Sequence, residues 1–310
     1  MKKLLALVLV LTLVLGMGVG VLAAPSDPTL ETMTEIKINK AINMGEGVVE
    51  TPAISGEYIL KFEDGSVSPA AGQTVPELGD VTSSGGVFTI PLSAFEDFGV
   101  YTYNFKELAG NTAGMTYDGR DLVLTVYVVL EDGEQIVYAT IHNSDGEKMV
   151  KIDSIDNKFD AGKLSIKKEV TGNMGEKDRY FEVKVTLNPG DDVIRNDISI
   201  SGGSHEENPD SIPAGELSAT LKIKDEDTIV LANIPEGVTY TVEETHPGDG
   251  YDDPVYEWNK EMDAVKIINN RSTLINTGIN LDNLPYILIL VGAAVGLVAF
   301  TMKRRLSDDR

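Results

Sequence analysis

Short runs of alternating apolar and polar residues occupy most of this chain, and Gly, Asp, Asn and Pro interrupt them. Residues two apart in a β-strand share a face, so this alternation predicts strands with one buried face. Clear examples are Tyr101, Tyr103 and Phe105, and Leu122, Leu124, Val126 and Val128. Predicted turns that tolerate positive φ are Asp64-Gly65, Asp118-Gly119 and Asp132-Gly133. Many short strands with such turns predict an all-β fold built from β-sandwiches.

The alternating pattern restarts in the second half of the chain, as a weak internal repeat of one fold. We therefore expect two tandem domains, residues 24–160 and 161–271, joined by the short linker Asp160-Ala161-Gly162. The repeated pairs of segments are 36–42 with 164–170 and 103–107 with 240–244.

The amino terminus has the pattern of an export signal. Met1-Lys2-Lys3 precedes an apolar run, which ends in small residues at Ala23-Ala24. This order predicts a secretory signal peptide at residues 1–23. The alternative is an N-terminal membrane helix, which the missing charged stop after the run disfavours.

The carboxyl terminus, residues 272–310, contains an apolar run from Leu284 to Met302 followed by Lys303-Arg304-Arg305. This run is long enough to cross roughly 30 Å of hydrocarbon as a transmembrane helix over 284–302. The basic triplet predicts a cytoplasmic end, which places the bulk of the chain outside the cell.

Charge and composition exclude several classes of function. A formal charge of -23 argues against nucleic acid and anionic membrane surfaces as partners. The chain has no cysteine, so an exported protein of this sequence needs a stabiliser other than disulfides. The 3 histidines lie far apart in sequence, so we expect no metal site and no cofactor, and a hydrolase lacks a catalytic constellation.

Each domain has a lysine, a glutamate and an asparagine in phase with apolar neighbours on the predicted core face. A buried lysine is costly unless it is neutral or paired. One interpretation is therefore an ion pair at a sheet edge, or a lysine whose head group reaches solvent. The first set is Lys40, Glu107 and Asn157, and the second is Lys168, Glu244 and Asn269.

The other interpretation is an intramolecular Lys–Asn isopeptide bond in each domain. Burial lowers the pKa of a lysine and raises that of a glutamate, by up to about 3–5 units each. A neutral amine can attack the Asn side-chain carbonyl, while a protonated Glu hydrogen-bonds the carboxamide oxygen and shuttles protons. Ammonia leaves, and a loop of about 100 residues is closed, which the chain-entropy model values at roughly 4–5 kcal/mol.

Several motifs resemble those of streptococcal-type backbone pilins from Gram-positive bacteria. Residues 35–160 resemble the pilin isopeptide-linkage domain, through Ile38-Asn39-Lys40-Ala41-Ile42 and the segment from Gly99 to Glu107. Residues 161–271 resemble the second pilin domain, and Tyr240-Thr241-Val242-Glu243-Glu244-Thr245 is similar to the pilin E-box. The resemblance implies Ig-like domains, with Glu107 and Glu244 as the proton shuttles of the two bonds.

The carboxyl terminus resembles the sorting signal of Gram-positive surface proteins. Its pentapeptide is Leu274, Ile275, Asn276, Thr277 and Gly278, and Ile275 stands where the family has Pro. In that family a sortase cuts between Thr and Gly, which implies cleavage at Thr277–Gly278. A plain membrane anchor is the alternative.

The resemblance implies a structural subunit of a sortase-assembled pilus rather than an enzyme, since its autocatalysis does not turn over. Expected partners are a pilus sortase, other copies of the chain and peptidoglycan, with minor pilins or a host ligand as further candidates. We expect the plasma membrane to hold the precursor and the cell wall to hold the protein after sortase cleavage. The polymerisation lysine is expected to be Lys148 or Lys151, with Lys148 favoured. The alternative function is a monomeric wall-anchored adhesin that binds a host ligand.

Overall fold

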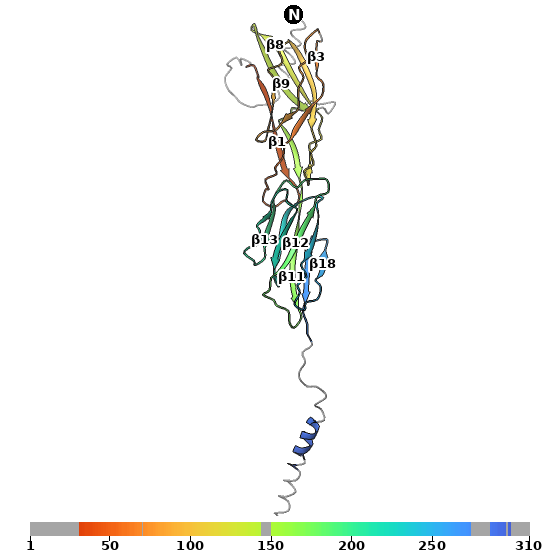
Figure 1. The fold of residues 1–310 in the computed structure, drawn as a ribbon. Coiled ribbons are helices and arrows are strands. Elements are labelled where there is room, and N and C mark those ends of the chain that lie inside the picture. Colours follow the sequence, from red (N-terminus) through yellow and green to blue (C-terminus); the bar gives the residue numbers. More distant parts are fainter. Residues whose placement is uncertain (1–30, 70, 144–149, 274–285, 296, 299–310) are drawn as a thin grey trace, which may run out of the picture. The chain divides into compact units, whose positions relative to one another are not determined.

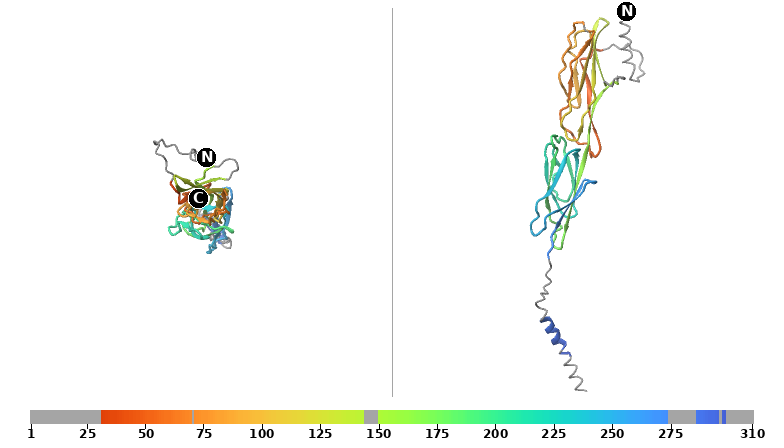
Figure 2. Two further views of the ribbon diagram at one scale, coloured as in Figure 1. Left: turned by 90° about the horizontal axis from the view of Figure 1, so that it is seen from above. Right: turned by 90° about the vertical axis from the view of Figure 1, so that its right-hand side faces the viewer.

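The computed structural model describes residues 31–69, 71–143, 150–273, 286–295 and 297–298. Figures 1 and 2 show that the regular structure of this part of the chain consists of strands, apart from one helix near the carboxyl terminus, in agreement with the predicted all-β class. It separates into two compact units, called unit 1 and unit 2. Unit 1 is Met1–Asn43, Glu57–Gly110 and Thr116–Asn157, and unit 2 is Met44–Gly56, Asn111–Met115 and Lys158–Arg310.

Two sheets enclose the core of unit 1. The smaller sheet has the strand order β5-β1-β10-β7, and the larger has the order β4-β2-β6-β8-β9 with β3 paired to β6. Apolar residues of both sheets, such as Phe88, Leu60 and Tyr101, are fully buried in one cluster. The bounds are β1 Glu35–Met44, β2 Ile59–Phe62, β3 Ser66–Ser68, β4 Val81–Thr82, β5 Val87–Pro91, β6 Gly99–Glu107, β7 Met115–Thr116, β8 Leu122–Glu131, β9 Glu134–Asn143 and β10 Ser154–Phe159.

Unit 2 also has two sheets around one core, with strand orders β14-β13-β16-β11-β19-β18 and β15-β12-β17. Leu164 and Leu231 from the first sheet pack with Val183 from the second. The bounds are β11 Ala161–Thr171, β12 Phe181–Asn188, β13 Ile198–Gly202, β14 Ser211–Ile212, β15 Ser218–Ile223, β16 Thr228–Pro235, β17 Thr239–Glu244, β18 Val255–Asn259 and β19 Ala264–Asn270.

In unit 2 the first long strand, β11, lies beside the last one, β19, and the two are parallel. Lys168 is opposite Ile267 in this pairing, and Val170 is opposite Asn269. Because residues two apart on a strand share a face, Asn269 projects from the same face as Ile267. The register therefore brings the Lys168 and Asn269 side chains to one place. In unit 1, β1 and β10 are likewise neighbours.

The segment Met44–Gly56 belongs to unit 2 although it directly follows β1. Asn233 holds it, because its Oδ1 accepts a hydrogen bond from Val49 N–H and its Nδ2 donates to Val49 C=O, both at 2.8 Å. Asn233 has φ 63°, a left-handed conformation that Asn tolerates better than most residues. The predicted domain boundary between residues 160 and 161 assigns this segment to the first domain, whereas the structure places it in unit 2.

The Asp-Gly dipeptides adopt different conformations. Asp132 and Gly133 both have positive φ at the tight turn between β8 and β9, as predicted. Among the described residues, neither Gly65 nor Gly119 adopts positive φ. Of the three predicted Asp-Gly turns, only Asp132-Gly133 therefore uses the positive φ that the dipeptide tolerates.

The described part of the carboxyl terminus includes a helix over 286–295. Within the described residues, no helix has the length and apolar character that a membrane span requires. The rest of the predicted span 284–302, apart from 297–298, lies outside the described residues, as do the signal peptide and the pentapeptide Leu274 to Gly278.

Candidate functional site

Unit 1 brings together a lysine from β1, a glutamate at the end of β6 and an asparagine from β10. Lys40 Nζ lies 3.3 Å from Glu107 Oε1, and Asn157 Nδ2 donates a hydrogen bond to the same oxygen at 3.1 Å. The side chains of Lys40 and Glu107 are 2% and 0% exposed, and Asn157 is fully buried. Strand alternation carries all three side chains inward. We call this group site 1.

The surroundings of site 1 favour neutral forms of the lysine and the glutamate. Lys40 Nζ lies 4.9 Å from the centre of the Tyr58 ring, a contact that by itself favours the charged amine. Burial lowers the pKa of Lys40, although the Glu107 charge acts in the opposite direction. Burial also raises the pKa of Glu107, and the nearby amine offsets only part of that rise. Both shifts act toward the neutral pair, in which the amine nitrogen is nucleophilic.

The turn that follows β7 supplies a further group to site 1. The backbone N–H of Asp118 donates to Asn157 Oδ1 at 2.9 Å and lies 3.3 Å from Glu107 Oε2. The Asp118 carboxylate is bound by the Arg120 guanidinium and by the N–H of Asp156. Burial acts to raise the pKa of Asp118, but the hydrogen bonds from Arg120 and Asp156 outweigh it, so this pKa is lowered.

Unit 2 contains an equivalent group, called site 2, built from β11, β17 and β19. Lys168 Nζ lies 2.7 Å from Glu244 Oε2, and Asn269 Nδ2 donates to Glu244 Oε1 at 2.5 Å. The side chains of Lys168 and Glu244 are both 0% exposed, and Asn269 is fully buried. Lys168 Nζ lies 4.6 Å from the centre of the Phe181 ring, and burial lowers the pKa of this lysine.

The two sites differ at the asparagine oxygen. Asn157 Oδ1 accepts the Asp118 hydrogen bond, whereas Asn269 Oδ1 is buried and has no hydrogen-bond partner among the described residues. Site 2 has its own supporting contact at the glutamate, where the N–H of Glu244 donates to the Tyr256 hydroxyl at 2.7 Å. Site 1 therefore contains a hydrogen-bond donor to the asparagine side-chain carbonyl, and site 2 as described does not.

In both sites the glutamate contacts the amide nitrogen of the asparagine. The hypothesis from sequence placed this contact at the carboxamide oxygen instead. The observed arrangement puts the carboxyl group beside the nitrogen that, in the predicted reaction, would gain a proton and depart as ammonia. Sequence reasoning also missed Asp118, Arg120 and Tyr256, because backbone donors and hydroxyl acceptors leave no mark in an alternating pattern.

The remaining predicted residues lie elsewhere or outside the described part of the chain. Lys151 is exposed and its backbone bridges His142 at the end of β9. Lys148, Thr277 and Gly278 fall outside the described residues. Across the described ranges, no group of His, Asp and Glu side chains has an arrangement that could hold a metal ion.

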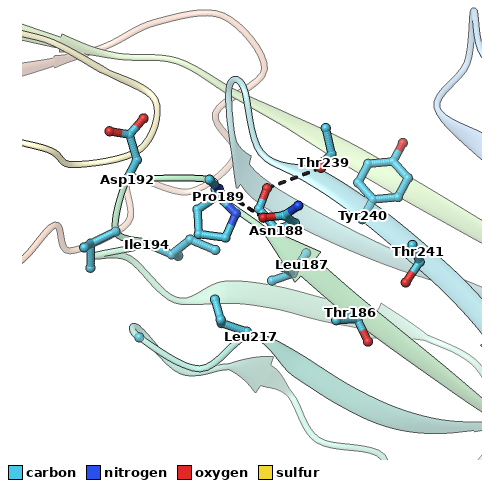
Figure 3. Close-up of a pocket in the computed structure, with 13 residues that line it drawn as sticks. Thr186, Leu187, Asn188, Pro189, Asp192, Ile194, Leu217, Thr239, Tyr240 and Thr241 are labelled. Atoms are coloured by element: carbon cyan, nitrogen blue, oxygen red, sulfur yellow. Dashed lines mark hydrogen bonds between the residues drawn. The ribbon is translucent and has the colours of Figure 1, made fainter.

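An open depression in unit 2 is unrelated to either site. It has a volume of about 670 Å³ and is bordered by Leu187, Ile194, Leu217 and Tyr240 (Figure 3). Among the residues that line it, Thr239 Oγ1 donates a hydrogen bond to Asn188 C=O. None of the six residues of sites 1 and 2 lines it, so the depression contributes nothing to their chemistry.

Comparison with known proteins agrees with this geometry. Residues 36–181 match a family described as the Spy0128-like isopeptide containing domain, and residues 162–278 match a domain of unknown function, DUF7601. A curated pilin of Streptococcus pyogenes serotype M1 is 26% identical in an alignment that covers 90% of this chain and 85% of that protein. The chain is thus similar over most of its length to a pilin of a Gram-positive bacterium.

Two solved structures share the fold of this chain. The major pilin from Streptococcus pyogenes superposes with a TM-score of 0.51 at 18% identity, over 77% of this chain and 99% of that one. The T-13 major pilin of the same species superposes with a TM-score of 0.51 at 18% identity, over 78% and 98%. At this identity, the likeness shows a shared all-β fold.

Proposed function

We propose that this chain is the structural subunit of a sortase-assembled pilus, stabilised by autocatalytic Lys–Asn isopeptide bonds in two Ig-like domains. The observation that carries the proposal is the pair of buried lysine–glutamate–asparagine groups, one in each unit. An ion pair alone leaves this arrangement unexplained, because it needs no asparagine whose amide nitrogen contacts the carboxylate.

The reaction at each site follows from the contacts. The neutral Lys Nζ attacks the Asn Cγ, and the electron pair of the C=O bond moves to Oδ1. The glutamic acid donates its proton to Nδ2, the Cγ–Nδ2 bond breaks, and ammonia leaves as the carbonyl re-forms. The glutamate then takes a proton from the new amide nitrogen, so it ends the reaction as it began.

The intact mass of the purified ectodomain tests this chemistry. We expect a mass lower than that of the sequence by one ammonia for each bond, and digestion should yield Lys40–Asn157 and Lys168–Asn269 cross-linked peptides. Lys40→Met and Lys168→Met variants each provide a matched control that regains one ammonia. If the folded parent protein had the full mass calculated from its sequence, the ion-pair interpretation would be favoured instead.

Polymerisation is the second part of the proposal. A sortase that holds Thr277 as an acyl-enzyme needs an exposed amine, and Lys40 and Lys168 are buried. We assign the acceptor to Lys148 or Lys151, with Lys148 favoured. Peptidoglycan receives the same Thr277 when the finished polymer is anchored, and the precursor waits in the membrane on its carboxyl-terminal segment.

The polymer can be tested in cell-wall extracts. We expect a ladder of covalent multiples on a denaturing gel, which disappears when the pilus sortase is deleted. Tandem mass spectrometry should find Thr277 joined to the Lys148 or Lys151 side chain. A ladder that persists in the Lys148→Arg, Lys151→Arg double variant would place the acceptor elsewhere, and a strictly monomeric wall protein would favour the adhesin.

A further inference from the structure

We propose that the backbone N–H of Asp118 acts as an oxyanion donor for the first isopeptide bond and that this aid is confined to site 1. The inference rests on the proposed Lys–Asn chemistry and adds a catalytic group to it. It starts from the 2.9 Å hydrogen bond that Asp118 N–H donates to Asn157 Oδ1.

Attack of the amine on Asn157 Cγ moves an electron pair onto Oδ1, so negative charge develops on that atom. A donor that already lies 2.7–3.1 Å from the oxygen stabilises this charge without reorganisation. The Asp118 N–H lies in that range and sits in a water-poor site, where such a contact is stronger than in bulk water.

The same N–H fixes the orientation of the asparagine amide. An N–H donor needs an oxygen acceptor, so Oδ1 must face Asp118 and Nδ2 must face Glu107. This orientation puts the leaving nitrogen on the acid and the developing oxyanion on the donor. One backbone group therefore aligns both halves of the reaction.

The Asp118 turn is itself held in place. Arg120 Nε donates to Asp118 Oδ1 at 2.9 Å, and its Nη2 donates to Asp118 Oδ2 and to Ser154 C=O. The N–H of Asp156, one residue before Asn157, also donates to Asp118 Oδ2 at 3.1 Å. Arg120 is thus a positioning residue, which ties the donor to the strand that carries the reacting asparagine.

Site 2 provides the contrast within the same molecule. Asn269 Oδ1 is buried and lacks a hydrogen-bond partner in the described part of the chain, although the lysine and the asparagine of site 2 also contact one glutamate, through its two different oxygens. The second bond should consequently be insensitive to any change at Asp118 or Arg120, which makes it an internal control for folding and sample handling.

A backbone ester at residue 118 tests the donor directly. The full ectodomain is made by cell-free translation with the α-hydroxy analogue of aspartate at position 118, which replaces the N–H by oxygen and keeps the side chain. Samples are quenched in acid at intervals, and both cross-linked peptides are quantified by mass spectrometry. We expect the first bond to form about 10²–10³-fold more slowly and the second at its normal rate.

Three further variants separate loss of the donor from a general disturbance of the fold. An ester at Gly119, whose N–H donates to neither Glu107 nor Asn157 in the described structure, should leave both rates unchanged. Arg120→Gln should slow only the first bond, and Arg120→Lys should restore part of the rate, because the lysine keeps one charged donor but not the two-pronged contact.

The possible results test the oxyanion donor separately from the isopeptide bonds on which it depends. An unchanged rate of the first bond in both the 118 ester and the Arg120→Gln variant overturns the oxyanion donor. Equal slowing by the esters at 118 and 119 also overturns it. If neither bond forms in the natural chain, the isopeptide proposal itself fails. If the protein with the ester at 118 does not fold, as judged by loss of the second bond, the Arg120→Gln and Arg120→Lys variants decide the question.

Discussion

Lys168 lies opposite Ile267 in the parallel pairing of β11 and β19. This register places the lysine amine two residues short of Asn269 on the shared inner face, within reach of the glutamate that both side chains contact. A shift of one residue would turn one of the two partners to the outer face. The sheet pairing, more than any local motif, thus decides whether the second bond can form.

Glu244→Gln should prevent the second bond, since the amide keeps the shape of the carboxyl group but cannot shuttle the proton. The intact mass should regain one ammonia, and the free energy of unfolding of unit 2 should fall by about 4–5 kcal/mol, the value for a loop of about 100 residues. Mass spectrometry and thermal unfolding check this. Glu243→Gln, on the exposed face of β17, is the matched control and should change neither quantity. Normal cross-linking in Glu244→Gln would remove the glutamate from the mechanism.

The rate of the first bond should be nearly constant around neutral pH and fall on both sides. The pKa of Lys40 is lowered and that of Glu107 is raised, so the two titrations move toward each other. The reactive pair holds one proton in total. At low pH both groups are protonated and the amine is no longer nucleophilic, whereas at high pH the carboxyl group has lost the proton it must donate. Quenched time courses across this range check the profile. A rate that rises steadily into the ordinary lysine range would show that Lys40 titrates as an exposed amine.

Asn233→Ala should loosen the segment Met44–Gly56 in unit 2. The substitution removes both hydrogen bonds to Val49, each worth about 1 kcal/mol, and leaves alanine at φ 63°. We expect faster proteolysis within this segment and a melting temperature lower by several degrees. Asn233→Gly separates the two causes, because glycine tolerates the backbone conformation but also lacks the amide. Equal protease resistance in all three proteins would show that the Asn233 contacts do not hold the segment.

Thr277→Ala should leave the protein in the membrane fraction and remove it from the cell wall, because the proposed sortase forms its acyl bond at this residue. Cell fractionation followed by immunoblotting measures the distribution. Thr273→Ala, the same change outside the pentapeptide, is the control and should anchor normally. Wall attachment that survives Thr277→Ala would mean that another bond is cut.

The alternating pattern predicted an all-β class and placed six polar side chains on inner faces, and the structure brings those six together as two groups. Alternation assigned each polar side chain to a face, and a charged group on an inner face is conspicuous because its burial is costly. The role of Asp118 could not be predicted in this way. Asp118-Gly119 and Asp132-Gly133 are identical dipeptides. Asp132-Gly133 makes a tight hairpin turn, whereas Asp118 presents its N–H to a buried carbonyl. Only the strand pairing around each dipeptide distinguishes them.

The parallel neighbours β11 and β19 also determine how unit 2 would respond to mechanical load. With the proposed amide in place, tension that enters the unit through β11 passes across a single side-chain link and leaves through β19. The residues between Lys168 and Asn269 then carry none of the pull, however large their share of the unit. Extension would be limited to the few residues outside the link, and resistance to stretching would depend on a covalent bond instead of on sheet hydrogen bonds.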